Sequence, residues 1–281
     1  MTDPFRLLCV LAHPDDESLG CGGTLAKYGV EGVETHVLCA TRGERGRFGD
    51  VEPRPVPEVV GRAREAELRA AAGLLGVRSV DFLGYVDADL DQAPPSEAVA
   101  RIARHIRRIR PHVVITFGPD GGYGHPDHIA ISQFATAAVV AAAAAGHAET
   151  AGGPPPHVVS KLYYMAWDET QWSTYQSTFK SLSSTVDGRE RRAVPWRDWS
   201  ITTEVDAGDH WETVWRAVQC HRTQLAVYSK LSELTPQQHR SLWGRQTFYR
   251  VFSTVNGGRA RETDLFAGLR SGEQGAGTPL H

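Results

Sequence analysis

Apolar residues in the first half of the chain fall into blocks of two lengths. Short blocks without period-2 alternation are typical of strands buried on both faces of a parallel sheet. Longer blocks with apolar residues three and four positions apart are typical of helices that pack on such a sheet. The short blocks predict strands at 5–12, 33–40, 80–83 and 113–117. The longer blocks predict helices at 17–28, 58–75, 97–108 and 126–145, the first of them capped by Asp15.

Strands that alternate with helices indicate a doubly wound, mostly parallel sheet of the α/β class. Right-handed crossovers bring the carboxyl ends of such strands to one edge, where ligands bind. The second half is less regular: we expect a strand at 157–167, short mixed elements over 172–215 and a helix at 209–228. The Gly- and Pro-rich segment 146–156 is the candidate linker, and the Gly-rich end at 270–281 is expected to be frayed.

The composition indicates a soluble globular protein. The chain has 281 residues, and 30 Lys and Arg against 33 Asp and Glu give a net charge of −3, which disfavours a nucleic-acid binder. The alanine-rich run 134–145 is shorter than the roughly 20 residues of a membrane span, and the acidic N-terminus is unlike a secretion signal. Four cysteines without a CxxC pair predict reduced thiols. We therefore expect a cytoplasmic protein with a small-molecule partner, no nucleic acid and no membrane span; a homo-oligomer is compatible with this composition.

Titratable side chains gather at two predicted strand-to-helix turns. His-Pro-Asp-Asp-Glu occupies 13–17, and Tyr-Gly-His-Pro-Asp-His occupies 123–128. A hydrolytic metal site needs about three nitrogen or oxygen ligands and an open position for water. His13 and Asp16 supply two ligands, and Asp15 is the candidate general base. The second turn supplies the third ligand, but His125 and His128 are also three residues apart, so the spacing allows either or both.

Other interpretations of these residues are weaker. A single His-x-x-Asp commonly starts a surface helix, but two histidine–carboxylate clusters at strand ends favour a metal or catalytic site. The glycines at 20, 22 and 23 do not make a dinucleotide fingerprint, because that pattern would need a glycine where Leu25 stands. They are better explained by close packing of a helix on the sheet. The chain has no GxxxxGK[ST], HExxH or GxSxG motif.

The segments 12–17 (AHPDDE) and 122–128 (GYGHPDH) resemble the LmbE-like (PIG-L) family of metal-dependent N-deacetylases. This family includes deacetylases of N-acetylglucosaminyl-inositol in mycothiol biosynthesis and of other glycosides. Weaker similarity at 41–46, 64–68, 83–87 and 221–224 extends the resemblance over residues 5–225. It implies a Rossmann-like α/β fold, with residues 1–150 as the catalytic core and 151–281 completing the same domain and the substrate pocket.

The resemblance also implies roles for individual residues. The implied zinc ligands are His13, Asp16 and His128, with Fe²⁺ or Co²⁺ able to replace zinc. Asp15 is then the general base, Tyr123 donates a hydrogen bond to the developing oxyanion, and His125 faces the substrate with its ring held by Asp127. Arg64 and Asp87 match positions that contact the sugar.

These residues predict a zinc-dependent hydrolase that removes the acetyl group from an N-acetylated amino sugar or glycoside. The first alternative is an amidase of mycothiol-type S-conjugates, disfavoured because residues 18–20 lack the lysine expected after the acidic motif. The second is a non-catalytic sugar-binding protein, disfavoured because such a protein needs no base beside a metal. We interpret the arginines of loop 41–57 as part of a solvated loop rather than as a site that recognises a phosphate, carboxylate or polyol of the substrate. We expect His221 to be a buried core histidine rather than a catalytic one. We expect the tryptophans of 167–215 to pack in the core rather than stack on sugars.

Overall fold

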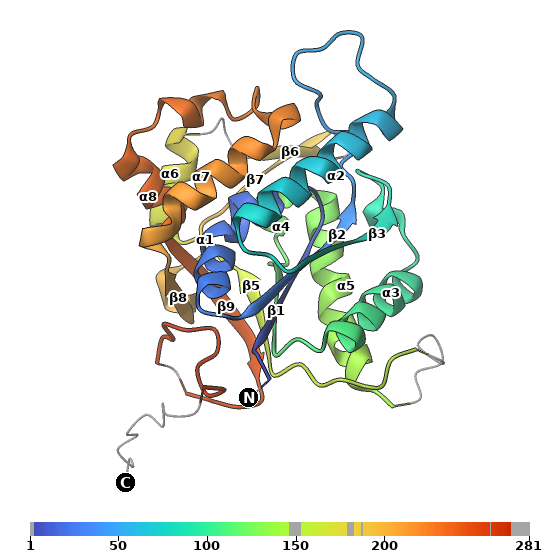
Figure 1. The fold of residues 1–281 in the computed structure, drawn as a ribbon, viewed down its shortest axis with the longest axis vertical. Coiled ribbons are helices and arrows are strands. Elements are labelled where there is room, and N and C mark those ends of the chain that lie inside the picture. The colour runs from blue at the N-terminus through green and yellow to red at the C-terminus, as the bar shows by residue number, and fades with distance from the viewer. Residues whose placement is uncertain (1–2, 146–152, 179–182, 187, 259, 271–281) are drawn as a thin grey trace.

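A seven-stranded sheet forms the centre of the computed structural model, which describes residues 3–145, 153–178, 183–186, 188–258 and 260–270. The strand order is β3-β2-β1-β4-β5-β9-β8 (Figure 1). The strands are β1 (Arg6–Leu11), β2 (Glu34–Thr41), β3 (Ser79–Tyr85), β4 (Val113–Phe117), β5 (Lys161–Met165), β8 (Thr203–Asp206) and β9 (Arg245–Ser253). β1 to β5 are parallel, whereas β9 runs antiparallel to both β5 and β8. The predicted mostly parallel α/β sheet is confirmed.

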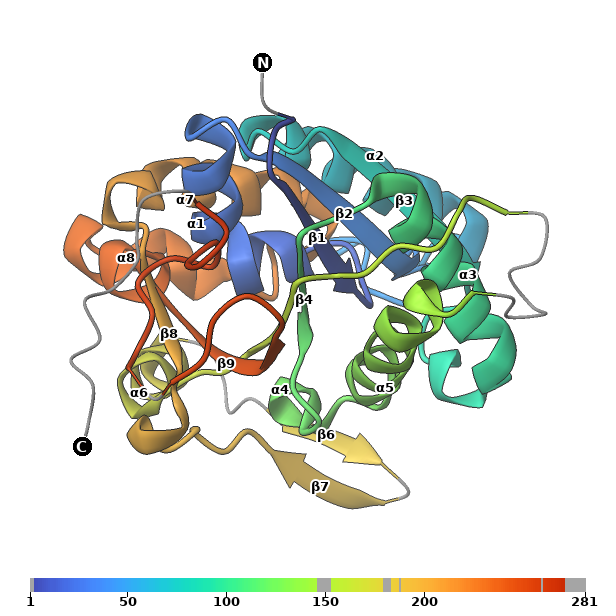
Figure 2. The same ribbon diagram turned by 90° about the horizontal axis from the view of Figure 1, so that it is seen from below.

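Helices cover both faces of this sheet (Figure 2). One layer consists of α1 (Asp16–Val30), α2 (Pro57–Leu74), α7 (Trp211–Cys220) and α8 (Pro236–Trp243). The other consists of α3 (Pro95–Ile109) and α5 (Pro126–Ala143), which pack against each other. The glycines of α1 let this helix pack closely on its neighbours, because a Cβ on Gly23 would lie 2.5 Å from the carbonyl oxygen of Trp243 in α8. Buried apolar residues of β1, β2 and β4 form the middle of the core, which explains their unbroken apolar runs.

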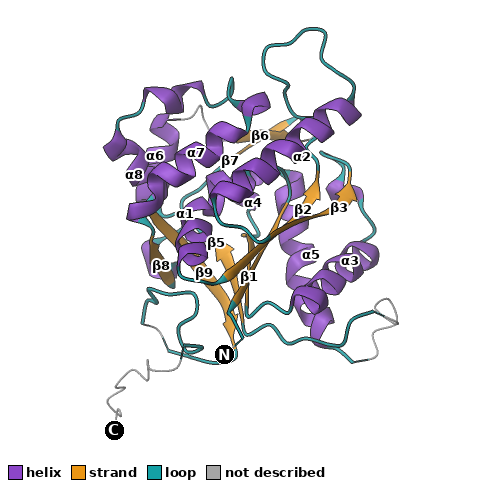
Figure 3. Cartoon of the chain, viewed as in Figure 1, coloured by secondary structure: helices purple, strands orange, loops and turns teal. Residues whose placement is uncertain are grey.

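Smaller elements surround one edge of the sheet. The short helix α4 (Gly121–Gly124) precedes α5, and the hairpin of β6 (Ser183–Val186) and β7 (Arg189–Arg192) lies beside it. The helix α6 (Glu169–Thr178) contacts α8. Residues 42–56 form a long loop between β2 and α2 that extends away from the rest of the molecule (Figure 3).

β1 pairs with β2 on one side and with β4 on the other. The connection after β1 leads to β2 on one side of β1. The connection after β4 leads to β5, on the other side of β1, so the connections that follow β1 and β4 run in opposite directions. In open α/β sheets this divergence creates the crevice in which ligands bind. Both predicted histidine-bearing turns follow these strands, so the topology brings them to that crevice.

Two predicted helix features differ from the structure. The helix expected over 209–228 ends at Cys220, because His221 leaves helical geometry with a ψ of 59° and buries its ring against Glu17. Short 3₁₀ turns follow it, at Arg222–Gln224 and Ser229–Glu233. Asp15 does precede α1, but its side chain makes no capping hydrogen bond. Its carboxylate instead binds Arg64 and Tyr228.

The remaining predictions concern the ends and the surface. Most of the candidate linker and nearly all of the Gly-rich end fall on 146–152 and 271–281, outside the described residues. All four cysteines are free thiols, three of them buried. Within the described part of the chain, no helix has both the length and the apolar character needed to cross a bilayer.

Candidate metal centre and active site

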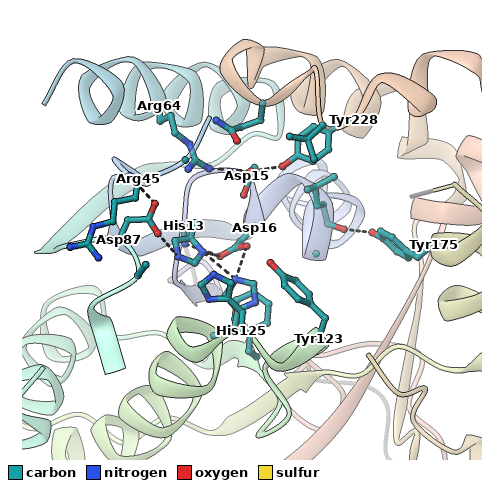
Figure 4. A pocket seen from close by; sticks show the side chains of 18 of the residues that line it. His13, Asp15, Asp16, Arg45, Arg64, Asp87, Tyr123, His125, Tyr175 and Tyr228 are labelled. Atoms are coloured by element: carbon teal, nitrogen blue, oxygen red, sulfur yellow. Dashed lines mark hydrogen bonds and ion pairs between the residues drawn. The ribbon is translucent and has the colours of Figure 1, made fainter. Parts of the chain in front are cut away.

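The two histidine-bearing turns face each other across one cavity (Figure 4). The turn after β1 contributes His13, Asp15 and Asp16, and the connection from β4 to α5 contributes His125 and His128. The cavity has a volume of about 510 Å³. The segments that contribute these groups are more than 100 residues apart in sequence, so the sheet topology alone brings them together.

Three side chains present donor atoms at the spacing that a metal requires. His13 Nδ1 lies 3.1 Å from His128 Nε2, and His128 Nε2 lies 3.5 Å from Asp16 Oδ1. Ligand atoms around a tetrahedral zinc with bonds of about 2.0–2.1 Å are roughly 3.3 Å apart. Both separations are close to this value, and Asp16 approaches His13 Nδ1 with its other oxygen, Oδ2, at 3.8 Å. The His125 ring also comes close, and the three histidines offer nitrogen atoms within 4.8 Å of one another.

The far side of each ring is held by the protein. His128 Nδ1 lies 3.2 Å from the carbonyl oxygen of Gly121, which fixes Nε2 as the atom that faces the cavity. His13 Nε2 lies 3.0 Å from Asp127 and 3.1 Å from Asp87, so Nδ1 is left for the cavity. Carboxylates and carbonyls in these positions are the usual partners of metal-binding histidines, since they fix the tautomer and orient the ring.

The Asp127 carboxylate therefore contacts His13 and not His125, the histidine that it was expected to hold. Its carboxylate accepts hydrogen bonds from the backbone N–H groups of Ala88 and Leu90 and contacts His13. It is the backbone N–H of Asp127 that reaches His125, donating to Nδ1 at 3.2 Å. The reason is its place in the first turn of α5, where the side chain points inward to the loop after β3.

Negative charge dominates this cluster. Burial opposes charge on His13, but hydrogen bonds to Asp127 and Asp87 and the charge of Asp16 prevail and raise the pKa of His13 to about 10. Burial raises the pKa of Asp16 to about 7 despite the opposing charge of His13. A buried carboxylate whose pKa is raised in this way indicates a place suited to a cation.

His125 and Tyr123 flank the donor set. Burial and the charge of His13 lower the pKa of His125 to about 4, so its ring is neutral at physiological pH. Burial and the nearby carboxylates raise the pKa of Tyr123 well above its ordinary value, so the phenol keeps its proton and can donate it in a hydrogen bond. The Tyr123 ring lies edge-on to His128, with 5.3 Å between the ring centroids.

Asp15 occupies a strained and heavily contacted position. Its φ of 109° is unusual for a residue with a side chain, and its backbone N–H donates to Glu17 Oε2 at 3.0 Å. Its carboxylate oxygen Oδ2 accepts from Arg64 at 3.1 Å and from the Tyr228 hydroxyl at 2.5 Å. Sequence reasoning missed Tyr228 because no motif marks it and 213 residues separate it from Asp15.

The two residues expected to contact the sugar line the cavity but bind protein groups. Arg64 donates to the carbonyl oxygens of Gly43 and Pro14 as well as to Asp15. Asp87 contacts His13 and accepts from the backbone N–H of Arg45 at 3.0 Å. Both side chains therefore organise the site in this structure.

Other expectations can be compared with the structure. In the loop after β2, Arg42 pairs with Glu65 and Arg45 with Asp89, so both arginines have protein partners. His221 is fully buried, and its Nε2 lies 2.8 Å from Glu17 Oε1, consistent with the structural interpretation of this histidine. Trp167 packs against the core, as expected, and also lines the cavity.

A family model described as PIG-L: GlcNAc-PI de-N-acetylase matches residues 8–139. The 1D-myo-inositol 2-acetamido-2-deoxy-alpha-D-glucopyranoside deacetylase of Rhodococcus opacus is 34% identical, over 94% of this chain and 98% of its own. Two solved structures share the fold at 22% identity. The N,N'-diacetylchitobiose deacetylase of Pyrococcus horikoshii has a TM-score of 0.65 and coverages of 89% and 84%. The 4-carboxy-2-hydroxymuconate hydratase GalB of Pseudomonas putida has a TM-score of 0.66 and coverages of 91% and 100%.

The parallel sheet and the cluster at its edge define an α/β protein whose histidines and carboxylates can hold a metal ion. The sequence identity to the deacetylases over nearly the whole chain identifies the family within this class of protein. The chain belongs to the PIG-L (LmbE-like) family and is an N-deacetylase of acetylated amino sugars.

Proposed function

We propose that this protein hydrolyses the acetamide of an N-acetylglucosaminide with the help of a zinc ion, and that 1D-myo-inositol 2-acetamido-2-deoxy-α-D-glucopyranoside is the first substrate to test. The observation that carries the proposal is the convergence of His13 Nδ1 and His128 Nε2 with the Asp16 carboxylate, whose Oδ1 lies 3.5 Å from His128 Nε2 and whose Oδ2 lies 3.8 Å from His13 Nδ1. The substrate follows from the relatives that match the chain over nearly its whole length.

His13, Asp16 and His128 would hold the ion. When bound, a divalent cation polarises a carbonyl oxygen and lowers the pKa of water, and Fe²⁺ or Co²⁺ suits the same donors. The protein prepares these ligands in advance, because backbone N–H groups of Ala12 and His13 fix Asp16 Oδ2 at 3.1 and 2.8 Å. Asp16 Oδ1 is then the oxygen that faces His128.

The remaining groups supply proton transfer and charge stabilisation. Asp15 accepts the proton of the attacking water and can return it to the amine that leaves. Tyr123 donates a hydrogen bond to the negative charge that develops on the carbonyl oxygen of the acetyl group, and the neutral ring of His125 lies beside Tyr123. A general base is typically worth about 10²–10⁴-fold in rate and an oxyanion donor about 10²–10³-fold.

Metal removal tests this function. Protein stripped with a chelator and reloaded separately with Zn²⁺, Fe²⁺ or Co²⁺ is assayed for amine and acetate released from the inositol glycoside and from free N-acetylglucosamine. We expect equal amounts of amine and acetate, lost on stripping and restored by metal. Release of a larger acyl group from an S-conjugate in place of acetate would indicate the amidase. Sugar binding without any turnover would indicate a binding protein.

A further inference from the structure

We propose that Tyr228 and Arg64 are positioning residues that fix the carboxylate of Asp15, an inference that rests on the proposed role of Asp15 as the base. The Tyr228 hydroxyl donates to Asp15 Oδ2 at 2.5 Å, and Arg64 Nη2 donates to the same oxygen at 3.1 Å. Two donors on one oxygen hold the carboxylate in one orientation. They leave Oδ1 as the oxygen that takes the proton of water.

Arg64 is held on the protein side of this contact. Its side chain is 4% exposed, Nη1 donates to the carbonyl oxygen of Gly43 at 2.9 Å, and Nη2 donates to that of Pro14 at 2.5 Å. The guanidinium thus joins the turn after β1 to the loop after β2. It could turn toward a sugar only by giving up these buried hydrogen bonds, so its position favours a role in orienting Asp15.

Tyr228 reaches Asp15 because the segment before it is fastened independently. His221 pairs with Glu17, the hydroxyl of Thr223 donates to Glu67 at 2.7 Å, and the amide of Gln224 donates to the carbonyl oxygen of Arg47 at 2.7 Å. These contacts tie residues 221–224 to α1, α2 and the loop after β2. The phenol of Tyr228 is therefore placed over the base by anchors outside the metal ligands.

This arrangement has a defined kinetic consequence. A base must lie within hydrogen-bond reach of its proton, and a misplacement of about 1 Å can cost on the order of 100-fold in rate. Removal of the hydroxyl leaves Arg64 as the one donor of this pair and frees the carboxylate to rotate. The loss should fall on the chemical step, since the hydroxyl is directed to the proposed base and not to a proposed metal ligand.

Tyr228→Phe tests the proposal, with Tyr28→Phe as the matched control. Tyr28 is buried and its hydroxyl donates to the Asp264 carboxylate at 2.7 Å, but it lies outside the cavity lining. For Tyr228→Phe we expect kcat to fall about 10- to 100-fold while KM and the Zn²⁺ dissociation constant, measured by chelator competition, stay within about twofold. Tyr28→Phe should lower the melting temperature and leave kcat unchanged.

A double-variant cycle shows whether the effect passes through Asp15. In an Asp15→Ala background, Tyr228→Phe should cause no further loss of residual activity. An equal loss in both backgrounds would overturn the proposal, as would a higher KM at unchanged kcat or weaker zinc binding. If Asp15→Ala alone retains full activity with zinc bound, the proposed base is wrong and this inference falls with it.

Discussion

The two halves of the molecule contribute to the site in different ways. The parallel half, from β1 to α5, supplies the histidines of the candidate metal site and Asp16 on two turns at adjacent strand ends. The half that contains the antiparallel strands supplies Tyr228 and the anchors around it. Reactive groups thus lie in compact motifs of the parallel half, which also supplies Arg64 and Asp127 as supports, whereas Tyr228 reaches the site from a distant, less regular segment. A site can therefore be recognised from local sequence before its supporting contacts can.

The substitutions with the largest expected effect lie in the parallel half. Asp15→Ala should lower kcat by about 10²–10⁴-fold, and Tyr123→Phe should lower it less, because a base contributes more than one oxyanion donor. Steady-state kinetics on the N-acetylglucosaminide, with metal content measured in the same samples, separates the two variants. An Asp15→Ala protein that binds metal and turns over normally would remove Asp15 from the mechanism.

A smaller effect is expected where the loop after β2 packs on Arg64. Gly43 has a φ of 62°, and a Cβ there would lie 2.1 Å from Arg64 Nη1. Gly43→Ala should therefore displace the guanidinium, lower kcat about 10-fold by loosening Asp15 and destabilise the fold by about 1–3 kcal/mol.

Gly49→Ala is the matched control for this change, since Gly49 lies in the same loop with a φ of 60° but has nothing within 4 Å of a new Cβ. It carries the same backbone cost without the collision. Kinetics and urea denaturation of both variants are the measurements. Equal kcat values would show that Arg64 does not position the base.

The smallest effect concerns stability of the second half. Burial opposes charge on Glu262, but Lys161, Tyr163 and Asn256 bind it and lower its pKa from 4.5 to about 2. A carboxylate with a lowered pKa in the folded state stabilises the protein above pH 4.5, and this contribution is lost as the pH falls toward 2. The free energy of unfolding should thus drop by about 2 kcal/mol from this group between pH 6 and pH 3.

Urea denaturation at the two pH values measures this loss, and Glu262→Gln is the comparison because the amide does not titrate. The variant should be less stable at pH 6 and less sensitive to acid. The same pH dependence in parent and variant would exclude Glu262 as the origin of the effect.

The sequence predicted the parallel sheet well because β1 and β4 are buried on both faces and therefore have unbroken apolar runs. It placed His13 and His128 in one crevice because they follow adjacent parallel strands. It could not predict that Tyr228 reaches Asp15, since that contact depends on where the helix before it stops. It also assigned the Asp127 carboxylate to His125, whereas the inward turn of α5 directs that carboxylate to His13.

The left-handed backbone of Asp15 has a consequence for evolution. A non-glycine residue in sparsely populated backbone regions costs on the order of 1–3 kcal/mol, and glycine would relieve much of it. Glycine would also remove the carboxylate that accepts hydrogen bonds from Arg64 and Tyr228, so the backbone and the side chains around it favour opposite residues at this position. Relief of the backbone alone therefore gives no reason for this position to drift toward glycine, and an aspartate held here in spite of the strain is held for what its carboxylate binds.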